Sequence, residues 1–270
     1  MRLLRRYPRT SFTLLCLAIS AFGVGFWMFR HYRFPSLAET FPQGELVVAI
    51  DPSYPPFGNI VDDTFVGLDV DLGRALAEHL GLTVRYMMVN FDSAYDAVET
   101  GTAHLSLAAL RVDNGRMSDF YYTWGYFNDG VMLASLNGIQ DGWELGGRRV
   151  GVELGSASHA EARKWSRRVK GLEILTFGTP AETLDALLDD GIVEAVMIDA
   201  ISLREHLQAH PESPISAEYL TAEFYAGAVR IDRRDLLYHL NSAMLALLNN
   251  GTIDALLQRH VGPEPKFVRP

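Results

Sequence analysis

Strand and helix patterns alternate along this chain from Glu45 onwards, and this alternation restricts the fold to the α/β class. Residues 46–50 form an apolar run of strand length, and leucines recur every four residues over 68–80 before Gly81 ends the helical pattern. The series continues with a strand around 84–88, a helix over 92–100 and a strand over 105–110. Repeated units of this kind predict a mostly parallel sheet flanked by helices.

A second strand–helix series begins near Arg149, with strands predicted at residues 150–152, 172–175 and 193–198. Ser158 and Glu161 form a capping-box pattern for its first helix, and Thr179-Pro180-Ala181-Glu182 predicts the start of the next one, which Gly191 ends. Further helices are expected at about 201–208, 233–249 and 252–260, with Gly251 between the last two. Because residues 128–148 separate the two series, the sequence predicts two lobes.

The N-terminal 33 residues have the composition of a targeting segment. They hold six arginines and no acidic residue, and residues 11–29 contain no charge. At about 1.5 Å per helical residue, such a stretch nearly spans a bilayer core of roughly 30 Å. We favour an uncleaved signal anchor over a cleaved signal peptide, with the rest of the chain on the extracytoplasmic side. The single cysteine, Cys16, lies inside this segment, so the remainder can form no internal disulfide.

The charge of the remaining residues excludes several function classes. The whole chain has a formal net charge of −9, so the part after the basic N-terminal segment carries −15. A body this acidic does not suit a nucleic-acid backbone. The histidines show no metal-ligand spacing, and no phosphate loop of the GxxxxGK type occurs. We therefore expect no nucleic acid, no metal and no cofactor.

Several candidate ligand-binding residues follow the predicted strands of the first series. In α/β folds, ligands gather at the carboxyl ends of strands. The turn DPSYPPF, residues 51–57, places Tyr54 and Phe57 after the first strand, either as core aromatics or as a wall for a small organic ligand. Phe91 follows the second strand and is a candidate for the opposite wall. Arg116 follows the strand over 105–110, where an arginine can hold a carboxylate or phosphate through two parallel hydrogen bonds.

The second series offers groups of complementary chemistry. The segment from Glu153 to Ser158 joins a strand to a helix, whose first free N–H groups suit an anion. Asp199 ends the strand over 193–198, where it either caps the next helix or receives an ammonium group. An arginine, a helix start and a carboxylate at facing strand ends would together bind a zwitterion.

These residues resemble the family 3 extracytoplasmic solute-binding proteins, the polar amino-acid receptors of ABC importers. The resemblance extends over about residues 44–262, and the segments that carry it are DPSYPPF, GLDVDLGRALAEHLGL (67–82), GRRVGVELGSAS (147–158), GIVEAVMIDA (191–200), FYAGAVR (224–230) and NSAMLALLNNGTIDALLQRHVG (241–262). It implies a type II periplasmic-binding-protein fold, with two lobes joined by two crossing strands. The expected parts are a first lobe of residues 44–128 with 226–262, a second lobe of 129–225, a linker over 34–44 and a tail over 263–270.

The resemblance also assigns roles to individual residues. Tyr54 and Phe91 match positions that flank the ligand, and Arg116 matches the arginine that binds the α-carboxylate. The register of Arg116 is supported by an aromatic, a Ser/Thr and a tyrosine at the family's usual distances after it, here Tyr122, Thr123 and Tyr126. Ser156 and Ala157 match a second-lobe loop that donates N–H groups to the carboxylate, and Asp199 matches an aspartate for the α-ammonium. Asp51 and Glu153 match positions that vary with the ligand. Phe57 and Ala109 complete the expected ligand contacts.

Arg111 departs from the family pattern, which commonly has Ser or Thr there, and Asp113 replaces a usual Thr. Arg111 either recognises an acidic side chain or a dicarboxylate, or it pairs with Asp113, Glu153 or Asp51. The resemblance implies a monomeric receptor that closes on an amino acid and serves an ABC permease or a sensor, with hinges near 126–130 and 223–227. Two alternatives remain: a cyclohexadienyl-dehydratase-like enzyme with Glu153 as general acid, and a membrane-tethered module that has lost its ligand.

Overall fold

A computed structural model describes residues 34–188 and 192–265. The N-terminal segment expected to be an anchor, and Gly191, lie outside these ranges. Within them, no helix is both long enough and apolar enough to cross a bilayer. The chain divides into two compact units, residues 1–42 and 43–270. In the first unit, Ser36 caps the short helix α2 (Leu37–Thr40); the features below belong to the second unit.

The first lobe is built on a five-stranded sheet with the strand order β4-β1-β5-β14-β6. The strand bounds are Glu45–Ile50 for β1, Thr83–Met88 for β4, Leu105–Leu107 for β5, Phe120–Tyr122 for β6 and Ala228–Arg230 for β14. β4 and β5 run parallel to β1, whereas β14 is antiparallel to both its neighbours. Four of the five strands therefore share one direction. Around this sheet lie the hairpin β2 (Asn59–Val61) and β3 (Thr64–Val66), and the helices α3 (Leu68–Leu80), η1 (Phe91–Ser93), α4 (Ala94–Glu99), α8 (Arg234–Asn249) and α9 (Thr252–His260).

The second lobe repeats this arrangement with the strand order β10-β9-β11-β8-β12. Its strands are β8 (Val131–Ser135), β9 (Arg149–Glu153), β10 (Glu173–Phe177), β11 (Ala195–Asp199) and β12 (Ser216–Tyr219). Here β8 is the strand antiparallel to both neighbours, whereas β9, β10 and β11 are parallel. The flanking helices are η3 (Gly142–Leu145), α5 (Ala157–Ser166), α6 (Pro180–Leu188) and α7 (Ala200–Ala209). The two-lobed α/β fold with mostly parallel sheets, predicted from the sequence, is confirmed.

Each lobe has its own apolar core. The helices and strands bury their apolar faces in these cores, so the spacing of apolar residues predicts them. In α3, the leucine repeat buries Leu68, Leu72 and Leu76 on one face, and Gly81 ends the helix in the left-handed conformation with φ 69°. One first-lobe core cluster joins residues of β1, α4, β6 and β14 with the segments on either side of β5. A separate cluster in the second lobe joins β8, β9, α5 and β11.

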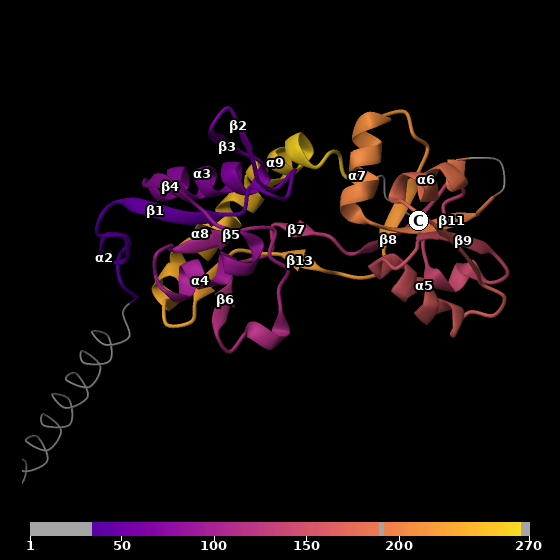
Figure 1. The fold of residues 1–270 in the computed structure, drawn as a ribbon, viewed down its shortest axis with the longest axis horizontal. Helices are drawn as coiled ribbons and strands as arrows, with labels where there is room; N and C mark the ends of the chain where they lie inside the picture. Colours follow the sequence, from indigo (N-terminus) through magenta and orange to yellow (C-terminus); the bar gives the residue numbers. More distant parts are fainter. Residues whose placement is uncertain (1–33, 189–191, 266–270) are drawn as a thin grey trace, which may run out of the picture. The chain divides into compact units, whose positions relative to one another are not determined.

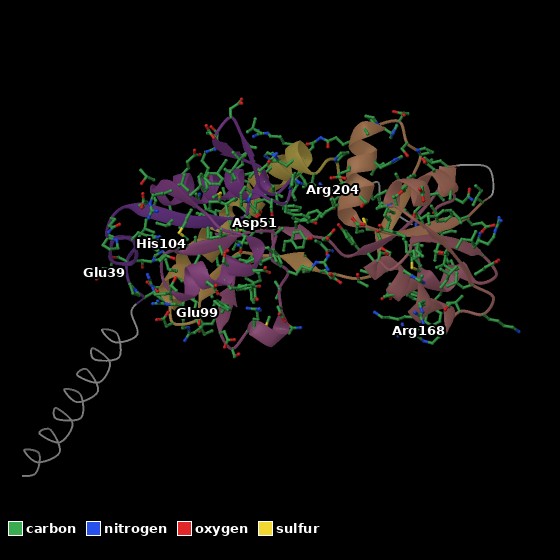
Figure 2. The ribbon with its side chains drawn as sticks, viewed as in Figure 1. Glu39, Asp51, Glu99, His104, Arg168 and Arg204 are labelled. Carbon is green, nitrogen blue, oxygen red and sulfur yellow. The ribbon has the colours of Figure 1, made fainter. Side chains whose placement is uncertain are left out.

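Two short antiparallel strands, β7 (Phe127–Asn128) and β13 (Phe224–Tyr225), run side by side between the lobes (Figure 1). The pairing continues beyond them, because the Asp129 N–H donates to the Glu223 carbonyl at 2.8 Å. The lobes are also connected at Arg204 on α7 (Figure 2), whose guanidinium donates two hydrogen bonds, of 3.0 and 2.8 Å, to the Gly262 carbonyl after α9.

Three elements differ from their sequence-based prediction. The strand predicted over 105–110 ends at Leu107, because the backbone of Ala109 turns sharply at φ 47°. The cap of α5 is Ser156 rather than Ser158: the Ser156 hydroxyl accepts the His159 N–H, and Ser158 is buried inside the helix. Residues 128–148, expected to separate the two series, contain β8, which joins the second sheet.

Candidate functional site

A cavity of about 870 Å³ opens on the first lobe at the carboxyl ends of β1 and β5. Its lining comes from four chain segments: the turn after β1, the start of η1 and α4, the segment after β5, and the crossing strand β13. The lining residues are Asp51, Ser53, Tyr54, Phe91, Tyr95, Ala109, Leu110, Arg111, Val112, Asp113, Asn114, Arg116 and Tyr225. Its size falls within the usual range for small-molecule sites, roughly 300–1,000 Å³.

Of the seven first-lobe residues predicted to contact a ligand, Phe57 does not line the cavity. The six that do are Asp51, Tyr54, Phe91, Ala109, Arg111 and Arg116. Phe57 is buried with 1% of its surface exposed, and its ring stacks on that of Tyr54 with centroids 5.6 Å apart and an interplanar angle of 7°. Phe57 also packs on Tyr225, at 5.1 Å between centroids. Phe57 therefore packs against the buried side of Tyr54 and not on the cavity. Tyr54 and Phe91 are 45% and 57% exposed.

Asp69 on α3 fixes the turn that brings the segment after β5 to the cavity. Its carboxylate accepts the Ala109 N–H at 2.8 Å, which holds Ala109 in its left-handed backbone conformation. Asp69 is fully buried, and this burial raises its pKa to about 7, with Tyr126 and the Ala109 N–H opposing the shift. The sequence pattern at GLDVDL predicted a helix start but did not reveal this contact.

Arg116 ends the short helix η2 (Asn114–Arg116), which Asp113 caps by accepting the Gly115 N–H at 2.8 Å. The Arg116 guanidinium lies over the Tyr95 ring, with its carbon 4.5 Å from the ring centroid. Its Nε is 3.7 Å from the Asp113 carboxylate, and both side chains are about half exposed, at 51% and 53%. This weak pairing leaves Arg116 accessible to an anion from the cavity.

The second arginine of the cavity wall has two stronger partners. Arg111 pairs with Glu223 at 2.7 Å and with Asp129 at 3.2 Å. The partners considered from the sequence were instead Asp113, Glu153 and Asp51. Burial lowers the pKa of Arg111, but Tyr225, Glu223 and Asp129 outweigh that effect and the net shift is upward. Arg111 is thus held by the crossing segments β7–Asp129 and Glu223–β13.

Of the two carboxylates that pair with Arg111, Asp129 is the more buried, with 4% of its side chain exposed. Burial raises its pKa to about 6; the Tyr225 hydroxyl, which donates to Asp129 at 2.8 Å, lowers the pKa, Asp199 raises it and Arg111 lowers it. Asp129 also accepts a 3.4 Å hydrogen bond from the Ile201 N–H, at the start of α7 in the second lobe. Asp129 therefore contacts both lobes.

The sequence-based reasoning missed Tyr95, Asp129, Tyr225 and Glu223. Asp129, Glu223 and Tyr225 lie within the hinge segments predicted at 126–130 and 223–227, but no spacing linked their side chains to Arg111. Tyr95 lies on α4, in a helix that the sequence predicted without assigning it a role.

The four second-lobe candidates lie at two strand-to-helix junctions rather than in the lining of this cavity. Ser156 caps α5, Ala157 is its first residue, and Gly155 before them has φ 86°. Glu153 ends β9. Asp199 caps α7 by accepting the Ser202 N–H at 2.8 Å, and it contributes to the raised pKa of Tyr54, although burial is the main cause of that shift. Across residues 34–188 and 192–265, no group of three His, Cys, Asp or Glu side chains is placed to hold a metal.

Comparison with known proteins places these features in a family. The model of the bacterial extracellular solute-binding proteins, family 3, matches residues 46–263. The L-cystine-binding protein TcyJ of Escherichia coli (strain K12) is 23% identical over 230 residues, covering 82% of this chain and 84% of that protein. The L-arginine-binding protein of Pseudomonas aeruginosa is 26% identical over 218 residues, covering 76% of this chain and 83% of its own length.

Solved structures show the same fold. Substrate binding domain 2 of Lactococcus lactis GlnP, in an open conformation, is similar with a TM-score of 0.66 and 22% identity, covering 82% of this chain and 97% of that domain. An ancestral cyclohexadienyl dehydratase is similar with a TM-score of 0.70 and 17% identity, covering 86% of this chain and 99% of that chain. At these identities the likeness concerns the fold alone.

Proposed function

Because the chain belongs to the family 3 bacterial extracellular solute-binding proteins, we propose that it captures an amino acid or a related small carboxylate between its two lobes. The observation that carries this proposal is Arg116, a half-exposed guanidinium in the wall of a cavity with exposed aromatic rings. Charge-assisted hydrogen bonds from its planar fork suit a ligand carboxylate. The rings of Tyr54 and Phe91 supply apolar surface for the rest of the ligand.

The second lobe completes the site on closure. The first N–H groups of α5, at Ser156 and Ala157, would join Arg116 on the carboxylate. Asp199 would receive the α-ammonium group, and its influence on Tyr54 supports a position facing the first lobe. We place the hinges at residues 126–130 and 223–227, around the paired strands β7 and β13, and the lobe boundaries at residues 128 and 226. The ligand favours the closed form only through the contacts that closure adds.

The family is extracytoplasmic, and relatives include an ABC transporter arginine-binding protein of Escherichia coli. For this chain we propose the extracytoplasmic face of the cytoplasmic membrane, a monomeric state, and an ABC permease or a sensor as the partner. We propose binding rather than catalysis as the role, because the similar sequences include binding proteins for L-cystine and L-arginine.

Isothermal titration calorimetry with the twenty standard amino acids tests the proposal. Arg116→Ala should weaken the binding of the best ligand by about 2–5 kcal/mol, because it leaves a buried carboxylate unpaired. Arg74→Ala is the matched control: Arg74 is exposed to a similar degree, 49% against 51%, but pairs with Asp71 on α3. Equal affinities in the Arg116 variant and the control contradict the assignment of Arg116.

A second variant tests the zwitterion arrangement. Asp199→Asn keeps a good helix cap for α7 but removes the negative charge. It should weaken amino acids and spare analogues that lack the amine; equal losses for both would exclude an ammonium partner at Asp199. Incubation with prephenate or arogenate, followed by product analysis, tests the dehydratase alternative. If no compound in either set binds or reacts, the module without a ligand becomes the better description.

A further inference from the structure

Arg111, the second cation of the cavity wall, also contacts the two proposed hinge segments. Its backbone forms a bridge with Tyr225 of β13, and its guanidinium spans carboxylates from both crossing segments, Asp129 after β7 and Glu223 before β13. The two segments are themselves joined by the Asp129–Glu223 backbone hydrogen bond. Arg111 therefore bridges two acidic groups that the fold holds next to each other, and its single positive charge is shared between them.

One of these acidic groups is too buried to lose its cation at low cost. The Asp129 side chain is 4% exposed, whereas Glu223 is 38% exposed and open to water. A ligand carboxylate that drew Arg111 towards the cavity would leave the Asp129 carboxylate to the Tyr225 hydroxyl and the weak Ile201 N–H contact. Removing one partner from a buried charge is far more costly than removing an exposed one.

The net charge around the cavity also disfavours a ligand with an acidic side chain. Arg111 and Arg116 face four acidic groups: Asp51 and Asp113 in the lining, and the two hinge carboxylates. If Arg116 binds the α-carboxylate, the rest of this set carries an excess of negative charge. Asp51 is itself buried, with 4% of its surface exposed, and is fixed by the Ser53 N–H at 2.9 Å. A negatively charged ligand side chain would meet this excess.

We infer that Arg111 is the internal counter-ion of the Asp129–Glu223 pair, and that the site consequently rejects amino acids with an acidic side chain. This inference rests on the proposed amino-acid-binding function. It decides between the two roles that the sequence left open for Arg111. The ligand class that follows is α-amino acids with a neutral or cationic side chain, and dicarboxylates are excluded from it.

Matched ligand pairs test the inference directly. Glutamate and glutamine, and aspartate and asparagine, have nearly the same shape and differ by one negative charge. Dissociation constants are measured by calorimetry at pH 8, or by competition against whichever amino acid binds most tightly. Each amide should bind at least about tenfold more tightly than its acid, a difference of 1.4 kcal/mol. An acid that binds as tightly as its amide, or more tightly, overturns the inference but leaves the proposed function in place. If none of the twenty amino acids binds, the proposed function fails, and the inference with it.

A double variant tests the cause of the selectivity. Asp129→Asn with Glu223→Gln keeps the size of both side chains, and the new amide oxygen at position 129 can still accept the Tyr225 hydroxyl. Freed from both carboxylates, Arg111 should bind the acidic ligand, so the amide-over-acid ratio should fall by about tenfold or more. Asp232→Asn with Glu212→Gln makes the same chemical changes at two exposed acidic groups, 60% and 79% exposed, and should leave the ratio unchanged. If the hinge variant retains the wild-type ratio while its thermal unfolding midpoint shows that it is folded, Arg111 is not the determinant.

Discussion

The Arg116 guanidinium lies over the Tyr95 ring, with its carbon 4.5 Å from the ring centre. Tyr95 also packs on Phe120, with centroids 4.8 Å apart, and its hydroxyl is 3.0 Å from that of Tyr122. The ring is thus fixed by the first-lobe core, and it restricts an otherwise half-exposed arginine. We propose that Tyr95 positions Arg116 for a ligand.

Replacing Tyr95 by leucine should therefore weaken the binding of carboxylate ligands. The loss of the cation–π contact and of the fixed arginine should cost about 1–2 kcal/mol, measured by calorimetry with the best ligand. Tyr95→Phe keeps the ring and loses only the hydroxyl contact with Tyr122, so its affinity should stay close to that of the wild type. Equal losses in both variants would assign the effect to the hydroxyl network instead of the ring.

The family, the two lobes and most of their elements could be predicted because the signals are local. Leu68–Leu80 has helical spacing and a terminal glycine, and the apolar runs of β1 and β11 need no knowledge of their neighbours. The end of β5 could not be predicted in this way. The turn at Ala109 depends on the Asp69 carboxylate, 40 residues earlier in the chain, which accepts its N–H.

The partners of Arg111 escaped prediction for a related reason. Asp113 is close in sequence, and Asp51 follows a neighbouring strand, so both were natural candidates. Glu223 reaches Arg111 only because β13 returns from the second lobe and pairs with β7, which Asp129 follows directly. A long-range pairing between two-residue strands leaves almost no periodic signal in the sequence.

Gly130, at the end of the first crossing segment, lies against the backbone of Thr221. A Cβ atom added there would meet the Thr221 carbonyl oxygen at 2.0 Å, which is backbone and cannot rotate away. Gly130→Ala should lower the free energy of unfolding by about 1–3 kcal/mol, measured by urea denaturation, through forced separation of the segments. Gly146→Ala is the control, because its nearest neighbouring atoms lie at 3.7 Å. Similar losses in the two variants would contradict this account.

The selectivity inferred for Arg111 should depend on pH. Burial raises the pKa of Asp129 to about 6, while Tyr225 and Arg111 oppose the shift and Asp199 adds to it. Below this pKa Asp129 becomes neutral and holds Arg111 less strongly, whereas a glutamate ligand, with a side-chain pKa of about 4.3, is still ionised at pH 5. The preference for glutamine over glutamate should therefore be smaller at pH 5 than at pH 8. Calorimetry with both ligands at the two pH values measures it, and a larger preference at pH 5 would refute the role of Asp129.

Asp69 should make the folded state less stable as the pH rises. Its pKa is raised from 3.8 to about 7, mainly by burial. Between these values the folded chain binds more protons than the unfolded chain, so the stability contribution of this group is fully present below pH 4 and is lost as the pH rises through 7. The loss is on the order of 4 kcal/mol.

Asp69→Asn should remove this dependence. The amide oxygen can still accept the Ala109 N–H, so the turn beside the cavity is retained. Because the variant has no proton to lose, its free energy of unfolding relative to the wild type should rise steadily from pH 5 to pH 8. Urea denaturation at several pH values measures the difference. A difference that stays constant over this range would show that Asp69 does not titrate there, and a difference that falls would show that its carboxylate is stabilised by more than the Ala109 N–H.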